Sequence, residues 1–258
     1  MASRSIARAD RRATLRASVR VAGLIAALLV CVPLHGLWRL FRLPSPWPRL
    51  FLGGAARICG ARVRTTGTPL KRGVIYLSNH RSWLDILVIA GATGCAFVAK
   101  AELRAAPLVG WLATLNRTIF VARTDRMGIA GQIAEVAAAI QQGWAVTIFP
   151  EGTTSAHDDI LPFKGSLLAA LAPPPPGVMV QPIYLDYGVA GPAIAWVGDE
   201  PGQENALKIL GRRGSFQATV HFLDPFAPGD HADRKSIAAQ AQAQIAAALR
   251  EPPRTFIR

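Results

Sequence analysis

Residues 74–85 read VIYLSNHRSWLD and place an apolar run directly before a polar turn and a helix start. The run 74–78 is short and rich in β-branched and aromatic residues, which is typical of a buried strand. Ser82 is a favoured N-cap residue, and Asp85 three positions later completes a Ser-x-x-Asp capping box. A strand that turns directly into a helix is the repeating unit of α/β folds.

Within this stretch His80 and Asp85 are five residues apart. On one continuous helix the two side chains would point about 140° apart, so they meet only if the chain turns between them. An aspartate beside an imidazole fixes the tautomer of the ring, and the second ring nitrogen can then take a proton from a hydroxyl. The pair is therefore a candidate general base. The spacing alone leaves a second interpretation open, in which Asp85 only caps the helix and His80 is a loop residue.

Strand-like and helix-like runs alternate along the rest of the chain. The expected strands are 62–66, 74–78, 96–99, 118–122, 145–149, 178–184, 193–197 and 217–223. The expected helices follow Pro48 as far as Cys59, and cover 127–142 and 232–250, where apolar residues recur at helical spacing. This alternation predicts a single α/β domain with a mixed, mainly parallel central sheet flanked by helices.

A second group of polar residues follows the expected strand 145–149. It comprises Glu151, Gly152, Thr153, Thr154 and Ser155. Because ligands of α/β proteins usually bind at the carboxyl ends of strands, this carboxylate and these hydroxyls could grip a polar head group. An ordinary polar turn is the alternative. Lys100 and Lys164 are further basic candidates, and for each of them a surface charge is the alternative.

The composition narrows the class of protein. Of the 258 residues, 51% are hydrophobic and 17% are charged, which argues against a disordered chain. The net charge of +13 indicates an anionic partner surface, and the high apolar content favours lipid over nucleic acid. Cys31, Cys59 and Cys95 have neither disulfide-type nor metal-type spacing, and the odd count fits a reducing compartment. We expect no metal site.

The N-terminal segment combines a basic stripe with an apolar run. Arginines recur every fourth residue from Arg4 to Arg20, and residues 21–34 carry no charge. On a helix this run, extended to Trp38, covers roughly 27 Å, close to the ~30 Å hydrocarbon core of a bilayer. We interpret residues 1–48 as a membrane anchor, spanning or interfacial, which precedes an α/β domain over 49–258. The basic flank predicts attachment at the cytoplasmic face of the membrane. A signal peptide and a buried helix of a soluble protein are the alternatives.

Four segments together resemble the sequence blocks of one enzyme family. Residues 79–85 resemble its His-x4-Asp motif, and residues 118–123 (TIFVAR) resemble its apolar strand ending in arginine. Residues 149–153 (FPEGT) and 180–183 (VQPI) resemble its third and fourth blocks, in the same order. On these motifs the chain resembles the 1-acylglycerol-3-phosphate acyltransferase family of glycerolipid acyltransferases, with residues 49–258 as the acyltransferase domain.

The resemblance implies roles for individual residues. His80 would deprotonate the acceptor hydroxyl, Asp85 would orient the imidazole, and Arg123 would hold an anionic head group. Glu151 and Gly152 would shape the acceptor pocket. The expected partners are membrane lipids, a lysolipid acceptor, and acyl-CoA or acyl carrier protein as the thioester donor, with no other cofactor and no nucleic acid. Two other hypotheses stay open: a lipid-ester hydrolase, and a non-enzymatic protein that binds anionic surfaces.

One position departs from the family pattern. Where the family commonly reads Glu-Gly-Thr-Arg, with the arginine binding phosphate, this chain has Thr154. Either another basic residue compensates, or the head group is not a simple phosphate monoester. The candidates for compensation are Arg117, Arg123, Arg126 and Lys164. The Glu-Gly-Thr-Thr-Ser form resembles a bacterial branch that includes acyltransferases of lyso-ornithine lipid, an aminolipid without phosphate. The sequence places lysophosphatidic acid first as acceptor and lyso-ornithine lipid as the alternative.

Overall fold

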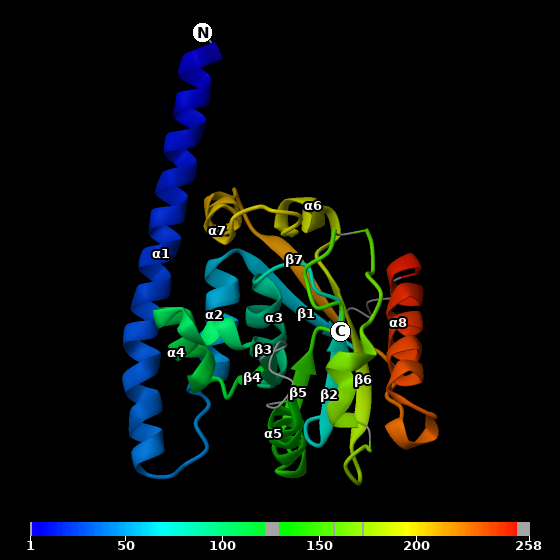
Figure 1. Ribbon diagram of the computed structural model, residues 1–258. Helices are drawn as coiled ribbons and strands as arrows, with labels where there is room; N and C mark the ends of the chain where they lie inside the picture. Colours follow the sequence, from blue (N-terminus) through cyan, green and yellow to red (C-terminus); the bar gives the residue numbers. More distant parts are fainter. Residues whose placement is uncertain (1, 122–128, 157, 172, 252–258) are drawn as a thin grey trace.

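Figure 1 shows a computed structural model of the chain, which describes residues 2–121, 129–156, 158–171 and 173–251. A seven-stranded sheet runs through the domain in the order β1-β7-β6-β2-β5-β3-β4. Neighbouring strands are parallel except for the antiparallel pair β6 and β7. The strands are β1 (Ala61–Thr66), β2 (Val74–Ser78), β3 (Ala96–Lys100), β4 (Ile119–Val121), β5 (Ala145–Ile148), β6 (Met179–Asp186) and β7 (Phe216–Phe222). The prediction of a mixed, mainly parallel sheet is confirmed.

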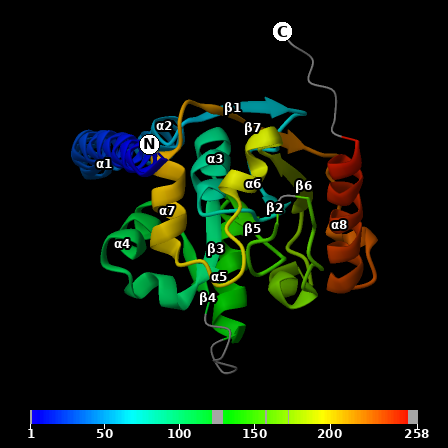
Figure 2. The same cartoon turned by 90° about the horizontal axis from the view of Figure 1, so that it is seen from above.

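Helices cover both faces of this sheet (Figure 2). One face carries α2 (Trp47–Ile58), α3 (Leu84–Thr93) and α7 (Gly202–Gly211), and the other carries α5 (Ile129–Gln141) and α8 (Arg234–Arg250). The shorter helical segments are α4 (Pro107–Leu115), α6 (Gly191–Ile194) and the 3₁₀ turns η1 (Ala101–Ala105), η2 (Gly165–Leu171), η3 (Gly188–Ala190) and η4 (Pro228–Asp230).

Strand β2 lies in the middle of the sheet and is buried on both faces. Its side chains alternate, so that Val74 and Tyr76 join the core cluster with α3, whereas Ile75 and Leu77 join the cluster with α5 and α8. All five residues of β2 are buried. The loop that follows Ser78 therefore starts from a fixed point in the core.

The expected elements match the observed ones with one clear exception. Seven of the eight expected strands occur within about two residues of their predicted bounds, and residue 122 of the strand 118–122 lies outside the described residues. The strand expected over 193–197 is wrong, because this part begins within helix α6 (Gly191–Ile194), which has a proline in its first turn. A short apolar run does not distinguish a strand from a buried helical turn.

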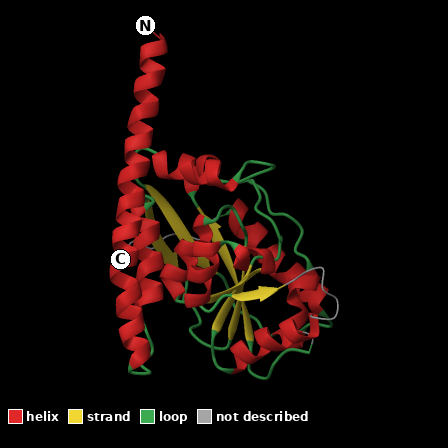
Figure 3. Cartoon of the chain, turned by 60° about the vertical axis from the view of Figure 1, so that its left-hand side comes forward, coloured by secondary structure: helices red, strands yellow, loops and turns green. Residues whose placement is uncertain are grey.

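Helix α1 (Ala2–Leu40) carries both the basic stripe and the apolar run on one continuous rod. Figures 1 and 3 show it standing along one side of the domain, with its N-terminal end reaching past the domain. Residues Arg11–Leu40 form one candidate membrane span by length and composition, with a mean hydropathy of 2.2 and only 6% of the apolar window buried. Such exposure contradicts the alternative of a buried helix in a soluble protein.

Two arginines of the basic stripe bind the protein itself. Arg16 donates to the carbonyl of Gly211 at 2.8 Å, and Arg20 donates to the carbonyls of Ile209, Leu210 and Gly214 at 3.0, 2.9 and 2.9 Å. The carbonyls of Ile209, Leu210 and Gly211 lie at the C-terminal end of α7, where a cation also interacts favourably with the helix dipole, and Gly214 lies just beyond it. These two residues of the stripe therefore dock α1 on the domain.

Candidate active site

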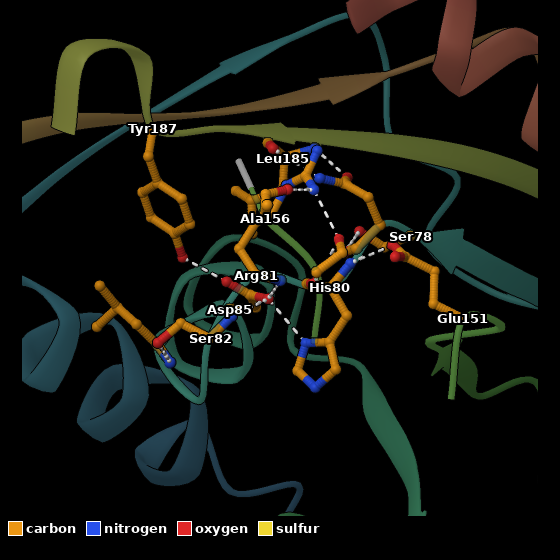
Figure 4. A network of polar contacts seen from close by, with 12 residues as sticks. Ser78, His80, Arg81, Ser82, Asp85, Glu151, Ala156, Leu185 and Tyr187 are labelled. Carbon is orange, nitrogen blue, oxygen red and sulfur yellow. Dashed lines mark hydrogen bonds and ion pairs between the residues drawn. The ribbon is translucent and has the colours of Figure 1, made fainter. Parts of the chain in front are cut away.

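His80 and Asp85 meet where β2 leads into α3. His80 Nδ1 lies 2.8 Å from Asp85 Oδ2, and Figure 4 shows the imidazole pointing its second nitrogen away from the polar network. The chain turns between the two residues, as the interpretation of this pair as a general base requires. Asp85 thus does more than cap the helix, and His80 is not an isolated loop residue.

The turn differs in detail from the expected capping box. The residue before the helix is Trp83, which already has helical angles, and the Ser82 hydroxyl contacts the N–H of Leu84 at 3.4 Å. Asp85 Oδ2 does reach back, and accepts the N–H groups of Arg81 at 2.6 Å and of Ser82 at 3.0 Å. Only the carboxylate half of the capping box forms, because the helix begins two residues after Ser82.

The Asp85 carboxylate is fully buried and hydrogen-bonded on both oxygens. Oδ2 faces the His80 ring and the two N–H groups, while Oδ1 accepts the hydroxyl of Tyr187 at 2.6 Å. A buried carboxylate is costly unless such donors surround it. Sequence reasoning missed Tyr187, because a single tyrosine after a strand belongs to no motif.

The His80 ring is held against an aromatic side chain. It stacks on Phe149 with ring centroids 4.0 Å apart and 15° between the planes, and Phe149 stacks in turn near Phe97. The His80 side chain is 19% exposed. No partner of its Nε2 occurs among the described residues. The ring is thus fixed on one side and has one nitrogen free for a substrate.

The loop after β5 clamps the backbone of His80. Glu151 Oε1 accepts the N–H of His80 at 2.8 Å, and the N–H of Ser155 donates to the carbonyl of His80 at 2.8 Å. Glu151 Oε2 accepts the N–H of Leu161 at 3.2 Å. Burial raises the pKa of Glu151, and the hydrogen bonds and the Arg81 charge oppose this effect. Both oxygens of Glu151 bind backbone groups, so this residue shapes the loop.

Residues 152–154 lie between Glu151 and Ser155, the two residues that clamp the backbone of His80. Gly152 has a positive φ of 75°, which an L side chain rarely adopts, and the turn there closes with a hydrogen bond from its N–H to the carbonyl of Phe149. Thr153 is exposed and Thr154 is half-buried. Both residues are therefore accessible from solvent beside the loop that holds His80.

Arg81 braces the same loop and was also missed from the sequence. Its side chain is 2% exposed, and Nη1 donates to the hydroxyl of Ser155 at 2.6 Å and to the carbonyls of Ala156 and Asp159. The carbonyl of Arg81 accepts the N–H of Trp196 at 2.8 Å. The one signal for this role was a charged residue within the quoted motif, directly between the catalytic candidate and the helix.

The basic candidates separate into three cases. Lys100 is exposed at the carboxyl end of β3, and Lys164 is exposed beside the loop, where its N–H donates to the carbonyl of Pro150. Arg117 stacks over Trp144 at the amino end of β5, which is the opposite edge of the sheet, so its expected compensation for Thr154 is wrong. Arg123 and Arg126 lie outside the described residues. Within the described ranges no group of three His, Cys, Asp or Glu side chains could hold a metal ion.

Comparisons with known proteins relate this chain to lipid acyltransferases. Residues 61–186 match the family model described as Acyltransferase. The chain is 34% identical to the lyso-ornithine lipid O-acyltransferase of Brucella abortus, over 92% of this chain and 94% of the relative, and 34% identical to that of Rhizobium meliloti over 83% and 78%. It is 34% identical to a 1-acyl-sn-glycerol-3-phosphate acyltransferase of Neisseria gonorrhoeae over 44% of each chain.

A solved structure supports the fold. The crystal structure of the 1-acyl-sn-glycerophosphate (LPA) acyltransferase from Thermotoga maritima superimposes with a TM-score of 0.70 and 20% identity, covering 97% of this chain and 100% of that chain. The two chains therefore share their fold.

Proposed function

This chain belongs to the acyltransferase family, and from that premise we propose that it transfers a fatty acyl group from an acyl thioester to the free hydroxyl of lyso-ornithine lipid. That it is a lysolipid-type acyltransferase follows from the family; the acceptor, the donor and the residue roles are our proposal. The observation that carries the mechanism is the 2.8 Å contact between His80 and Asp85, with the second imidazole nitrogen left free.

The proposed reaction begins with proton transfer to His80. Because Nδ1–H donates to Asp85, the lone pair of Nε2 can take the proton of the acceptor hydroxyl. The hydroxyl oxygen attacks the thioester carbonyl, so that a C–O bond forms and the C–S bond breaks. The leaving thiolate then takes the proton from the imidazolium. No acyl-enzyme forms, which fits a chain that lacks a Gly-x-Ser-x-Gly motif.

The surroundings of the His80–Asp85 pair, called the dyad below, support this proton transfer. The Asp85 charge stabilises the imidazolium as it forms, and the stack on Phe149 keeps the ring from rotating away. The clamp from Glu151 and Ser155 fixes the backbone of His80 on both sides of the peptide. The protein thereby prepares the general base before a substrate binds.

The choice of acceptor rests on two observations. Thr154 stands where the family's phosphate-binding arginine is expected, and lyso-ornithine lipid has no phosphate. Relatives named for lyso-ornithine lipid also resemble this chain over most of its length. Thr153 and Thr154 are the proposed contacts to the head group, and Lys100, Lys164 and Arg123 are proposed for its anionic part. Lysophosphatidic acid is the second candidate, because a phosphate-lipid acyltransferase matches over 44% of the chain.

We propose that the enzyme is attached to one leaflet of the membrane. The apolar helix α1 is docked along α2 and α7 through Gly23, Arg16 and Arg20, so the domain lies beside it. If α1 crossed the bilayer, the domain docked along it would be drawn into the hydrocarbon core. Exposed apolar side chains are frequent on α1 and α4, and include Leu15, Val19, Ile25, Leu29, Leu37 and Leu40 of α1 and Leu108, Val109 and Trp111 of α4. We assign residues 1–48 to this anchor, residues 49–258 to the catalytic domain, and the cytoplasmic face to the attachment.

One assay tests the acceptor and the donor together. Membranes containing the full chain are supplied with lyso-ornithine lipid or lysophosphatidic acid, each with acyl-CoA or acyl-ACP, and membranes without the chain serve as the blank. We expect the O-acylated ornithine lipid as the main product. Preferred formation of phosphatidic acid would refute the proposed acceptor, and release of free fatty acid without a diacyl product would indicate a hydrolase.

A further inference from the structure

The two oxygens of the Asp85 carboxylate have different partners. Oδ2 faces His80 and the backbone N–H groups of the turn, whereas Oδ1 accepts the hydroxyl of Tyr187 at 2.6 Å. Among the described residues, Tyr187 is the one donor to Oδ1. Figure 4 shows the tyrosine approaching Asp85 from the side opposite to the imidazole. The dyad is thus extended into a row of three side chains.

Tyr187 is held rigidly by the fold. It directly follows β6, its side chain is 3% exposed, and its ring lies edge-on to Phe216 with centroids 6.1 Å apart. Burial and the neighbouring Asp85 charge raise the pKa of Tyr187 well above its usual value. The hydroxyl therefore keeps its proton throughout the working range of pH, and it can serve the carboxylate only as a donor.

We infer that Tyr187 is a positioning residue of the acyl transfer, which acts through Asp85 and does not touch the substrate. Its hydroxyl holds Oδ1 so that Oδ2 stays aimed at the imidazole. It also stabilises the negative charge that the dyad carries while the imidazole is neutral. This inference rests on the proposed function, because it assigns Tyr187 to the step in which His80 takes a proton.

Loss of the Tyr187 hydroxyl should change the pH dependence of the reaction. The dyad carries one negative charge when His80 is neutral and none when His80 is protonated, and the positive end of the Tyr187 hydroxyl favours the charged state. The nearest other charged side chains are Arg81, whose guanidinium donates to the 155–159 segment, and Glu151, whose carboxylate accepts the backbone N–H of His80. A Tyr187→Phe substitution leaves both in place. Without the Tyr187 hydroxyl the negatively charged state of the dyad is less stabilised, so the dyad takes up a proton more easily. The acidic limb of the kcat/KM profile therefore moves to higher pH.

The test uses the full-length chain in membranes with lyso-ornithine lipid and the donor it prefers. For Tyr187→Phe we expect kcat to fall about tenfold, KM to stay nearly constant, and the acidic limb to move upward by about half a pH unit. Tyr76→Phe is the matched control, because Tyr76 is equally buried and its hydroxyl donates to the carbonyl of Leu70, away from Asp85. We expect the control to keep the wild-type profile.

A double-mutant cycle covers the case of a destabilised variant. If Tyr187 acts through Asp85, then Tyr187→Phe adds little further loss of kcat in an Asp85→Asn background. A full tenfold loss in that background, or a wild-type pH profile in the single variant, would overturn the inference. The His80→Ala variant distinguishes failure of the proposed function from failure of the role of Tyr187. If His80→Ala keeps normal turnover, the proposed function fails. If His80→Ala is inactive but Tyr187→Phe keeps the wild-type pH profile, only the role of Tyr187 is refuted.

Discussion

Replacing Arg81 should destabilise the protein and slow the reaction, although this side chain reaches no substrate in our account. Arg81→Met keeps most of the volume and removes the guanidinium that donates to Ser155, Ala156 and Asp159. Three acceptors of the 155–159 segment, the buried Ser155 hydroxyl and the part-buried carbonyls of Ala156 and Asp159, then lose their donor. Because Ser155 also holds the carbonyl of His80, the disturbance reaches the dyad directly.

The magnitude follows from these contacts. A hydrogen bond to a charged group contributes about 1.5–3 kcal/mol, but one nitrogen shared among three acceptors supplies less than three full bonds. Relief of the buried charge, whose Nη2 has no partner in the described part of the structure, offsets part of the loss. We expect a net loss of about 3 kcal/mol in the free energy of unfolding, which lowers Tm by roughly 6–12 °C in a chain of this size.

The assay compares three variants by denaturant unfolding and by turnover at saturating substrates. Arg81→Met should lose stability as above and kcat by about tenfold or more, and Arg81→Lys should be intermediate because it keeps the charge without the planar fork. Arg213→Met is the control, since Arg213 is exposed. The bracing role is refuted if Arg81→Met matches Arg213→Met in both Tm and kcat.

Three further predictions follow from other contacts. Arg20→Ala removes the donor to the end of α7, so proteolysis between α1 and α2 should speed up while kcat stays unchanged; equal cleavage rates would contradict the docking. Phe149→Leu removes the stack on His80, so steady-state kinetics should give a kcat about tenfold lower with KM nearly constant; an unchanged kcat would contradict its role. Burial raises the pKa of Cys59 from 9.0 to about 11, so the folded state binds its proton more tightly and stability falls as pH rises through this window. Urea unfolding should give a flatter decline for Cys59→Ala, and an identical slope would contradict the prediction.

The central strand and its turn were predictable because the apolar composition of the segment agrees with its buried place in the middle of the sheet. Strand 74–78 was placed correctly by its apolar composition, and the polar turn after it brings His80 and Asp85 together as the spacing required. The segment 193–197 failed because five apolar residues after a proline fit a helical turn as well as a strand. Only the packing against its neighbours decides between them.

The residues that surround the dyad were less accessible to sequence reasoning. Tyr187 is 102 residues away from Asp85 along the chain, and a contact at that separation has no periodic or motif signal. Glu151 was expected at the head group, yet it holds backbone N–H groups, because its burial leaves the carboxylate no free direction. The basic stripe of α1 likewise did not reveal that Arg16 and Arg20 dock on α7, because only the folded chain brings the end of α7 beside α1.

His80 as the proton acceptor is the central step of the proposed reaction, and the turnover of His80→Ala tests this step directly. The variant removes the imidazole but leaves the Glu151 and Ser155 clamps on the backbone of residue 80, so the protein should still fold. With lyso-ornithine lipid and its thioester donor, we predict that kcat falls by about 10²–10⁴-fold while unfolding is unchanged. A folded His80→Ala that acylates the acceptor at the wild-type rate would contradict the account.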